Sequence, residues 1–198
     1  MPNALIVIDM QLDFCPGGRL AVAGGDEIVA PINDLMADYD AVVLTQDWHP
    51  RDHSSFAVNH PGAEPYATVE MPYGPQVLWP EHCVIGSEGA GFHPALAVDL
   101  ADLVIRKGFR PQIDSYSAFF ENDRATPTGL AGYLRERGLE DLTFVGLAHD
   151  FCVAWSAIDA ARLGFRARVI ESAARAIDLD GSLDRARAGM AQAGVVQE

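Results

Sequence analysis

Cysteine is scarce in this sequence of 198 residues, and its three cysteines form neither a redox pair nor a disulfide framework. Cys15, Cys83 and Cys152 lie far apart, so the chain has no Cys-x-x-Cys pair of the kind that indicates a thiol redox protein. An odd and sparse set of cysteines is also typical of proteins in a reducing compartment. We therefore expect a cytoplasmic protein without structural disulfides.

Basic residues and long apolar runs are also in short supply. Lysine and arginine number 14 against 28 acidic residues, which gives a formal net charge of −14. A negative field of this size repels phosphate backbones and anionic lipids, so nucleic acid and membranes are not expected as partners. No run approaches the roughly 20 apolar residues of a membrane span. The N-terminal run 5–8 ends at Asp9, which predicts a first strand rather than a signal peptide.

Several well-known catalytic and nucleotide-binding motifs are missing. The sequence has no Gly-x-Ser-x-Gly elbow, no Walker loop and no Gly-x-Gly-x-x-Gly after a strand. The absence of a nucleotide-binding loop leaves little support for a kinase or a dehydrogenase.

What the sequence does have is a regular alternation of short apolar runs and helical patterns. The runs cover residues 5–8, 41–44, 103–105, 143–147 and 167–170 and are rich in Val, Ile and Leu. Runs without polar alternation are typical of strands that are buried on both faces. The length suits a single domain spanning residues 1–198. We predict an α/β sandwich with a mostly parallel central sheet.

The expected helices are bounded by recognisable start and stop residues. Thr126 followed by Pro127 predicts a helix start, and Gly138 predicts the end of that helix. A strongly apolar helix is expected from Cys152 to about residue 163. Ser182 is expected to cap a last helix that reaches about residue 192.

One stretch does not follow the alternation. Residues 48–100 are rich in Pro, Gly and His and contain five of the six histidines, namely His49, His53, His60, His82 and His93. A loop of that length inside a compact domain usually has a function. We expect an insertion in the domain that carries binding residues.

Polar residues follow the ends of four predicted strands. Asp9, the segment that contains Asp47 and His49, Lys107, and the segment that ends at Cys152 each come after an apolar run. Ligands of open parallel sheets bind beyond the carboxyl ends of the strands, so these side chains are expected to converge. Each residue alone has an ordinary explanation, as a core cysteine, a strand-end carboxylate or an exposed lysine. Together they supply the acid or base, the cation and the thiol of nucleophilic catalysis.

Asp47 and His49 are two residues apart, so they face the same side of an extended segment. With His82 they make a carboxylate and two imidazoles, a set that suits Zn²⁺, Fe²⁺ or Mn²⁺ and leaves positions open for water or substrate. The alternative is that both are loop histidines without a metal. Cys83 is expected to be buried packing rather than a fourth ligand.

The same segments resemble a known family. The pieces Leu-Ile-Val-Ile-Asp9-Met-Gln-Leu-Asp-Phe14, Thr-Gln-Asp47-Trp-His49-Pro, Trp79-Pro-Glu-His82-Cys-Val, Arg-Lys107-Gly, Asp-Ser-Tyr116-Ser-Ala-Phe-Phe and Gly-Leu-Ala148-His-Asp-Phe-Cys152-Val stand in the order of the isochorismatase-like cysteine hydrolases. They span nearly the whole chain. The Asp-x-His pair with Trp-Pro-x-His-Cys is similar to the metal-binding nicotinamidase (pyrazinamidase) branch, and relatives without metal lack it.

This resemblance implies a Rossmann-like three-layer sandwich and a site with defined roles. The catalytic triad would be Asp9, Lys107 and Cys152. One divalent metal ion, Zn or Fe with Mn as a further candidate, would be held by Asp47, His49 and His82. The ring of the substrate would lie against Phe14, Trp79 and Tyr116. The backbone amides of Ala148 and Cys152 would form the oxyanion hole, beside a cis peptide between Leu147 and Ala148.

The activity that the resemblance implies is deamidation of nicotinamide to nicotinate and ammonia in NAD salvage, with pyrazinamide as a further substrate. Two alternatives stay open: a metal-independent hydrolase of N-carbamoyl or ureido compounds, and a non-catalytic binding protein on the same fold. His149 departs from the family pattern, where Thr is expected, and His53 is a further candidate neighbour of the metal. The oligomeric state is left open, a homo-oligomer included.

Overall fold

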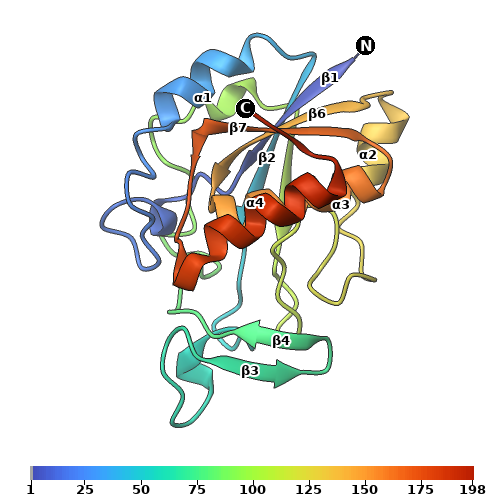
Figure 1. Ribbon diagram of the computed structural model, residues 1–198. Helices are drawn as coiled ribbons and strands as arrows, with labels where there is room; N and C mark the ends of the chain where they lie inside the picture. Colours follow the sequence, from blue (N-terminus) through green and yellow to red (C-terminus); the bar gives the residue numbers. More distant parts are fainter. Residues whose placement is uncertain (1) are drawn as a thin grey trace.

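A computed structural model describes residues 2–198, and its centre is a six-stranded parallel sheet (Figure 1). The strands stand in the order β5-β2-β1-β6-β7-β8, and every neighbouring pair is parallel. Their bounds are β1 Asn3–Ile8, β2 Ala41–Asp47, β5 Leu103–Lys107, β6 Asp141–Leu147, β7 Arg166–Arg175 and β8 Val196–Gln197. The prediction of a mostly parallel α/β sheet is confirmed.

The central strands are buried on both faces, as their unbroken apolar runs predict. Every residue of β2 is buried, and so are the last five residues of β1. The expected first strand is therefore present and lies in the middle of the sheet. Among the six strands of the central sheet that the structure describes, only β8, a two-residue strand at the edge, had no expected counterpart, because two residues are too few for a pattern to show.

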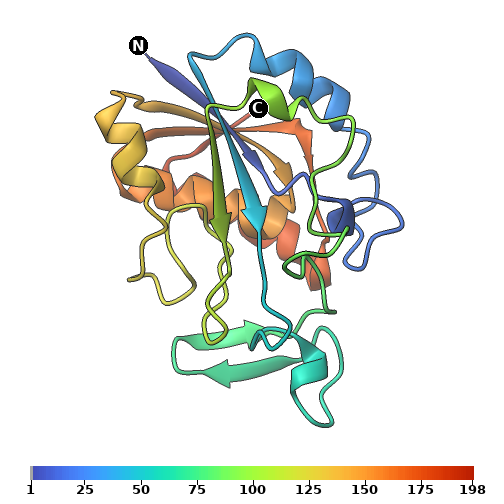
Figure 2. The same cartoon turned by 180° about the vertical axis from the view of Figure 1, so that it is seen from behind.

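Helices cover both faces of the sheet (Figures 1 and 2). Helix α1 (Val29–Met36) lies on one face, and α3 (Ala154–Arg162) and α4 (Ser182–Ala193) lie on the other. Helix α2 (Leu130–Glu136) precedes β6 and buries Leu130 and Leu134. It ends before Gly138, whose φ of 67° fits the expected stop.

Two expected helix caps are wrong, although the last helix, Ser182–Ala193, lies where it was expected. Thr126 and Pro127 precede α2, because Pro127 pairs with Phe120 in an isolated bridge and the helix begins only at Leu130. Ser182 is the first residue of α4 and its hydroxyl does not cap the helix; it donates a hydrogen bond to the carboxylate of Asp150. The hydroxyl of Thr126 donates instead to the carboxylate of Asp123, three residues earlier, so in both cases a carboxylate takes the polar group that the pattern assigned to a cap.

The irregular stretch between β2 and β5 contains a small antiparallel hairpin, β3 (Thr68–Met71) with β4 (Gly74–Val77). The hairpin lies beyond the carboxyl ends of the parallel strands (Figures 1 and 2). The segments on either side of it run back to the sheet edge, so this part of the chain covers the end where the polar residues gather. None of the helices within residues 2–198 has the length and apolar character needed to span a membrane.

Candidate functional site

Four segments deliver the predicted catalytic side chains to one edge of the sheet. Asp9 directly follows β1, and Lys107 is the last residue of β5. Cys152 lies in a π-helical turn, His149–Val153, that follows β6 and continues into α3. The apolar helix expected from Cys152 therefore begins three residues earlier, with wider turns than an α-helix. Parallel strands bring these residues together because their carboxyl ends share an edge.

The acid, the cation and the thiol are in contact. Lys107 is the only lysine of the sequence and is fully buried. Its Nζ lies 2.8 Å from Oδ2 of Asp9 and 3.5 Å from Sγ of Cys152, and it donates to the carbonyl of Ser115 at 2.9 Å. The other oxygen of Asp9 accepts a 2.6 Å hydrogen bond from Thr45. The ordinary explanation of Lys107, that it is a solvent-exposed lysine, is therefore wrong.

Burial shapes the protonation of this group. Burial raises the pKa of the Cys152 thiol well above its usual value, and Lys107 opposes that rise. Burial also raises the pKa of Asp9, again against the attraction of Lys107. Burial would lower the pKa of Lys107, but the charges of Asp47 and Asp9 outweigh it, so its pKa is raised and the ammonium stays protonated. A thiol with a raised pKa thus lies beside a carboxyl group whose pKa is also raised, which favours transfer of a proton between the two.

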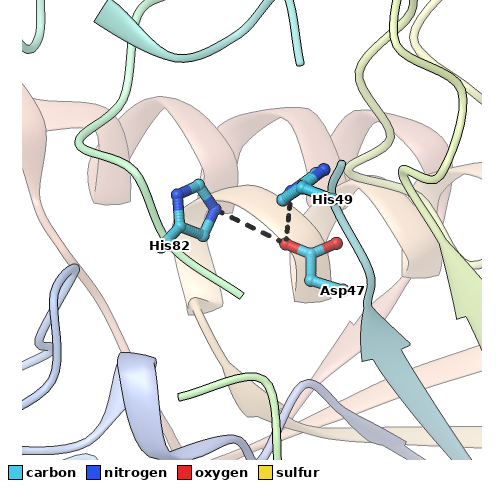
Figure 3. A group of neighbouring side chains, drawn as sticks. All are labelled: Asp47, His49 and His82. Carbon is cyan, nitrogen blue, oxygen red and sulfur yellow. Dashed lines mark ion pairs between the residues drawn. The ribbon is translucent and has the colours of Figure 1, made fainter. Parts of the chain in front are cut away.

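The predicted metal ligands form a second cluster beside the triad. Asp47, His49 and His82 are all buried, and their ligand atoms lie within 4.8 Å of one another. Nε2 of His49 is 3.4 Å and Nε2 of His82 is 3.7 Å from Oδ2 of Asp47 (Figure 3). Asp47 ends β2, whereas His82 comes from the long stretch between β4 and β5.

The hydrogen bonds of the two imidazoles leave room for a cation. Nδ1–H of His49 donates to the carbonyl of Gly108 at 2.8 Å, and Nδ1–H of His82 donates to the carbonyl of Pro80 at 2.8 Å. This fixes the tautomer, so both Nε2 lone pairs face the same oxygen of Asp47. Nε2 of His49 is buried without a hydrogen-bond partner. Two lone pairs and a carboxylate around one point fit a divalent metal ion.

The backbone near Gly108 is shaped around His49. Gly108 has a φ of 68°, and a Cβ there would lie 2.4 Å from the imidazole. Burial lowers the pKa of His49, but Asp47, Asp114 and the carbonyl of Gly108 together outweigh burial and raise that pKa overall. The cluster therefore stabilises a positive charge at this imidazole, which a metal ion also supplies.

Asp47 belongs to both clusters. Its Oδ1 lies 2.5 Å from Nζ of Lys107, and its Oδ2 faces the imidazoles of His49 and His82. Burial would raise the pKa of Asp47, but Lys107, His49 and His82 together outweigh burial and hold that pKa well below its usual value. The carboxylate therefore stays ionised and links the thiol side of the site to the metal side.

A narrow cavity lies between the two clusters. Its walls include Phe14, Trp79 and Tyr116, the three residues expected to hold a ring, together with Cys152 and His82. The hydroxyl of Tyr116 accepts a 3.0 Å hydrogen bond from Nε1 of Trp79. The free volume is about 20 Å³, roughly one water molecule. A substrate ring therefore enters only when a wall side chain moves.

Four further wall residues were missed in the sequence. Phe151, Leu20, Ile177 and Asp114 also line the cavity. The ring of Phe151 packs edge-on against Trp79, with centroids 4.9 Å apart. Phe151 had a signal, since it directly precedes the nucleophile; Leu20 and Ile177 lie in loop segments and had none.

Ala148, His149 and His53 were also singled out in the sequence. The peptide between Leu147 and Ala148 is cis, and Ala148 lines the cavity. His149 is buried but belongs to neither the cavity nor the metal group. His53 packs against His49, with ring centroids 4.3 Å apart, but its nitrogens already have partners in Ser55 and the carbonyl of Ile113.

Cys83 is fully buried and is absent from the metal group, as expected for packing. Of the other loop histidines, His60 is held by a 2.7 Å hydrogen bond to the carbonyl of Ser54, and Nδ1 of His93 accepts from the amide of Ala95 at 3.3 Å.

A thiol in contact with a buried ammonium and a carboxylate, at the carboxyl edge of a parallel sheet, is the arrangement of an α/β cysteine hydrolase. Comparison with known proteins gives the same answer. The family model described as the Isochorismatase domain matches residues 3–197. The chain therefore belongs to the isochorismatase family.

Close relatives have names that are more specific. A nicotinamidase from Acinetobacter baylyi is 57% identical over 192 residues, 97% of this chain and 90% of that protein. The structure of an Acinetobacter baumanii nicotinamidase and pyrazinamidase is 56% identical with a TM-score of 0.97, covering 98% of this chain and 94% of the other.

Two further structures were solved with ligands. A protein from L. infantum in complex with nicotinate is 40% identical with a TM-score of 0.87, covering all of this chain and 92% of the other. A pyrazinamidase from Pyrococcus horikoshii in complex with zinc is 32% identical with a TM-score of 0.79, covering all of this chain and 99% of the other.

Proposed function

We propose that this protein is a metal-containing nicotinamidase that hydrolyses nicotinamide to nicotinate and ammonia with the thiol of Cys152. The observation that carries the proposal is the contact of two clusters through Asp47, one with a thiol and one with metal ligands. The names of close relatives and the nicotinate complex support the substrate. Pyrazinamide, also a flat ring carboxamide, is proposed as a second substrate, and the product would enter NAD salvage.

The first step is a proton transfer within the triad. The carboxylate of Asp9 accepts the proton of the Cys152 thiol, and the ammonium of Lys107, 3.5 Å from the sulfur, stabilises the thiolate. The turn that carries Cys152 begins a helical segment, so its N-terminal amides also favour negative charge.

The thiolate then forms a bond to the amide carbon while the carbonyl π electrons move to oxygen. The backbone amides of Ala148 and Cys152 are proposed to bind this oxyanion; loss of one such donor typically costs about 10²–10³ in rate. Asp9 returns its proton to the amide nitrogen as ammonia leaves, which yields a thioester on Cys152. Water, deprotonated by Asp9, cleaves the thioester to the acid and restores the thiol.

The residues that position the ring of the substrate differ from those that react with its amide group. Phe14, Trp79 and Tyr116 are proposed to enclose it, which places the amide carbon against the sulfur. Asp47, His49 and His82 would hold the metal, which, when bound, supplies a Lewis-acid contact that orients the ring nitrogen. Zn²⁺ is the first choice, since a zinc complex exists among the relatives, and the same ligands suit Fe²⁺ and Mn²⁺.

We also propose that residues 1–198 form one domain and that the stretch 48–100 is its metal-binding insertion, because His49 and His82 both lie in it. A cytoplasmic location is proposed on the ground that all three cysteines are free and buried.

The test is ammonia release from nicotinamide by purified protein, beside Cys152→Ala and a sample treated with chelator and then given back Zn²⁺. The proposal expects release that requires both the thiol and the metal. Cys152→Ala should lose turnover and keep its metal, whereas His82→Ala should lose the metal and most activity. Hydrolysis of N-carbamoyl compounds but not nicotinamide would reject the substrate, and no hydrolysis of any amide would reject the enzyme.

A further inference from the structure

We propose that Asp13 is a positioning residue that holds both imidazole ligands of the metal group through the peptide of Cys83. Asp13 lies in a 3-10 turn, Leu12–Phe14, directly before the wall residue Phe14. It touches neither cluster of the site directly, and the mechanism does not use it. The inference rests on the proposed metal site and adds the residue that fixes its geometry.

The carboxylate of Asp13 is almost completely buried, with 5% of the residue exposed. Its Oδ2 accepts a 2.7 Å hydrogen bond from the amide of Cys83, and its Oδ1 accepts a 3.2 Å hydrogen bond from the amide of Arg19. A charge-assisted hydrogen bond that a backbone amide donates to a buried carboxylate is short and strong, so it fixes the peptide that carries the amide. Asp13 thus links its own turn to Cys83, 70 residues further along the chain, and to Arg19, six residues further along.

The peptide of Cys83 connects the two histidine ligands. Cys83 directly follows His82, and its carbonyl accepts a 3.0 Å hydrogen bond from the amide of His49. The amide of Ile85 in turn donates to the carbonyl of His49 at 2.8 Å. Asp13 therefore fixes the N–H group of Cys83. The C=O group of the same residue accepts from His49, and His82 directly precedes Cys83 in the chain.

This residue is held in an uncommon conformation. Cys83 has a φ of 46°, in the left-handed region that non-glycine residues rarely adopt. Such a conformation persists only where the surrounding structure determines it. The hydrogen bond that Asp13 accepts from the Cys83 amide constrains the backbone in this conformation. Without that hydrogen bond, the peptide is free to relax and to turn His82 away from Asp47.

Gly89 leaves the space that Asp13 occupies. A Cβ on Gly89 would lie 2.2–2.3 Å from the carboxylate atoms of Asp13, closer than real contacts allow. The amide of Asp13 also donates to the carbonyl of Gly89 at 3.0 Å, so the two residues stay in register. The side chain is thus confined, and a methyl group at position 89 would displace the carboxylate without changing its chemistry.

Two variants test the inference by different means. Asp13→Asn replaces the carboxylate that accepts from the Cys83 amide with a neutral carboxamide. Gly89→Ala leaves the carboxylate of Asp13 intact but displaces it. Zn²⁺ affinity is measured by competition with a chromogenic chelator, and the d–d spectrum of the Co²⁺-loaded protein reports the ligand geometry. Both variants should bind Zn²⁺ about 10–100-fold more weakly, the usual effect of losing a group that orients a ligand. Both should also change the Co²⁺ spectrum.

The matched control is Asp150→Asn. Asp150 is equally buried and accepts from the amides of Ile177 at 3.0 Å and Asp178 at 2.8 Å, but on the thiol side of the site. Its variant should keep the parent Zn²⁺ affinity and Co²⁺ spectrum. At saturating Zn²⁺, Asp13→Asn should regain most of its kcat, which a variant with a damaged triad cannot do.

The outcomes separate the inference from the proposal beneath it. If His82→Ala binds Zn²⁺ as tightly as the parent, the metal site itself is rejected, and the inference with it. If His82→Ala is weakened while Asp13→Asn and Gly89→Ala keep the parent affinity, only the role of Asp13 is overturned. An equal loss in Asp150→Asn would also overturn it, because the effect would then follow from any lost buried carboxylate. Should Asp13→Asn not fold, Gly89→Ala decides alone.

Discussion

Replacing Lys107 with methionine should reduce stability far more than breaking an exposed ion pair of the same length. Lys107 Nζ lies 2.8 Å from Asp9, and both side chains are fully buried. At an effective dielectric constant of 20, unit charges at this distance attract by about 6 kcal/mol before desolvation is subtracted. Removing one partner of a buried pair typically costs about 3–5 kcal/mol, because the other charge is left uncompensated. Here two carboxylates, Asp9 and Asp47, lose the same cation.

The structure provides a control for this variant. Arg19 and Glu81 form an ion pair of 2.7 Å, but the arginine side chain is 64% exposed. Arg19→Met should therefore lower the free energy of unfolding by no more than about 1 kcal/mol. The assay is urea unfolding of metal-free protein at pH 7 for the parent and both variants, with equal m-values as the check on a common unfolded state. A Lys107→Met loss as small as that of Arg19→Met would refute the reasoning that buried charge compensation holds this site together.

Three further predictions follow from the same geometry. Asp9→Asn keeps the shape of the side chain but removes the base, so kcat should fall by about 10²–10⁴-fold with little change in Kd for nicotinate, measured by calorimetry. Phe151→Ala removes a wall that packs on Trp79 at 4.9 Å, so the KM for nicotinamide should rise and larger ring amides should gain relative to it; an unchanged substrate profile would contradict this role. Burial lowers the pKa of His53 from 6.5 to about 4, so the unfolded chain binds an extra proton between those values and stability falls as pH drops from 6.5 to 4. The loss from this residue is roughly 3 kcal/mol, and His53→Asn should flatten that part of a plot of unfolding free energy against pH.

The fold was largely predictable because its strands are buried on both faces. Unbroken apolar runs such as 5–8 and 41–44 have no solvent-facing side to interrupt them, so they mark the central strands directly. The helix starts were less predictable. Thr126 and Ser182 are residue types that cap helices, but in this protein their hydroxyl groups donate to the carboxylates of Asp123 and Asp150 instead. The β3–β4 hairpin gave no clear signal, since each strand has only four residues and β4 begins with Gly-Pro.

The candidate residues of the site were predictable for a related reason. Asp9, Asp47, Lys107 and Cys152 each stand at or after a strand end, and a parallel sheet gathers such positions at one edge. The sequence thus determined which chemical groups meet: an acid, a cation, a thiol and a set of metal ligands.

Only the tertiary structure decided how these groups are connected. The shared use of Asp47 by Lys107 and the imidazoles depends on which oxygen faces which partner, and spacing along the chain does not specify this. Contacts between segments far apart in the sequence likewise bury Lys107 and pack Phe151 against Trp79. The hydrogen bond between Asp13 and Cys83 is another such contact. Local pattern records the preferences of each segment, whereas distances and protonation arise where segments meet and exclude water.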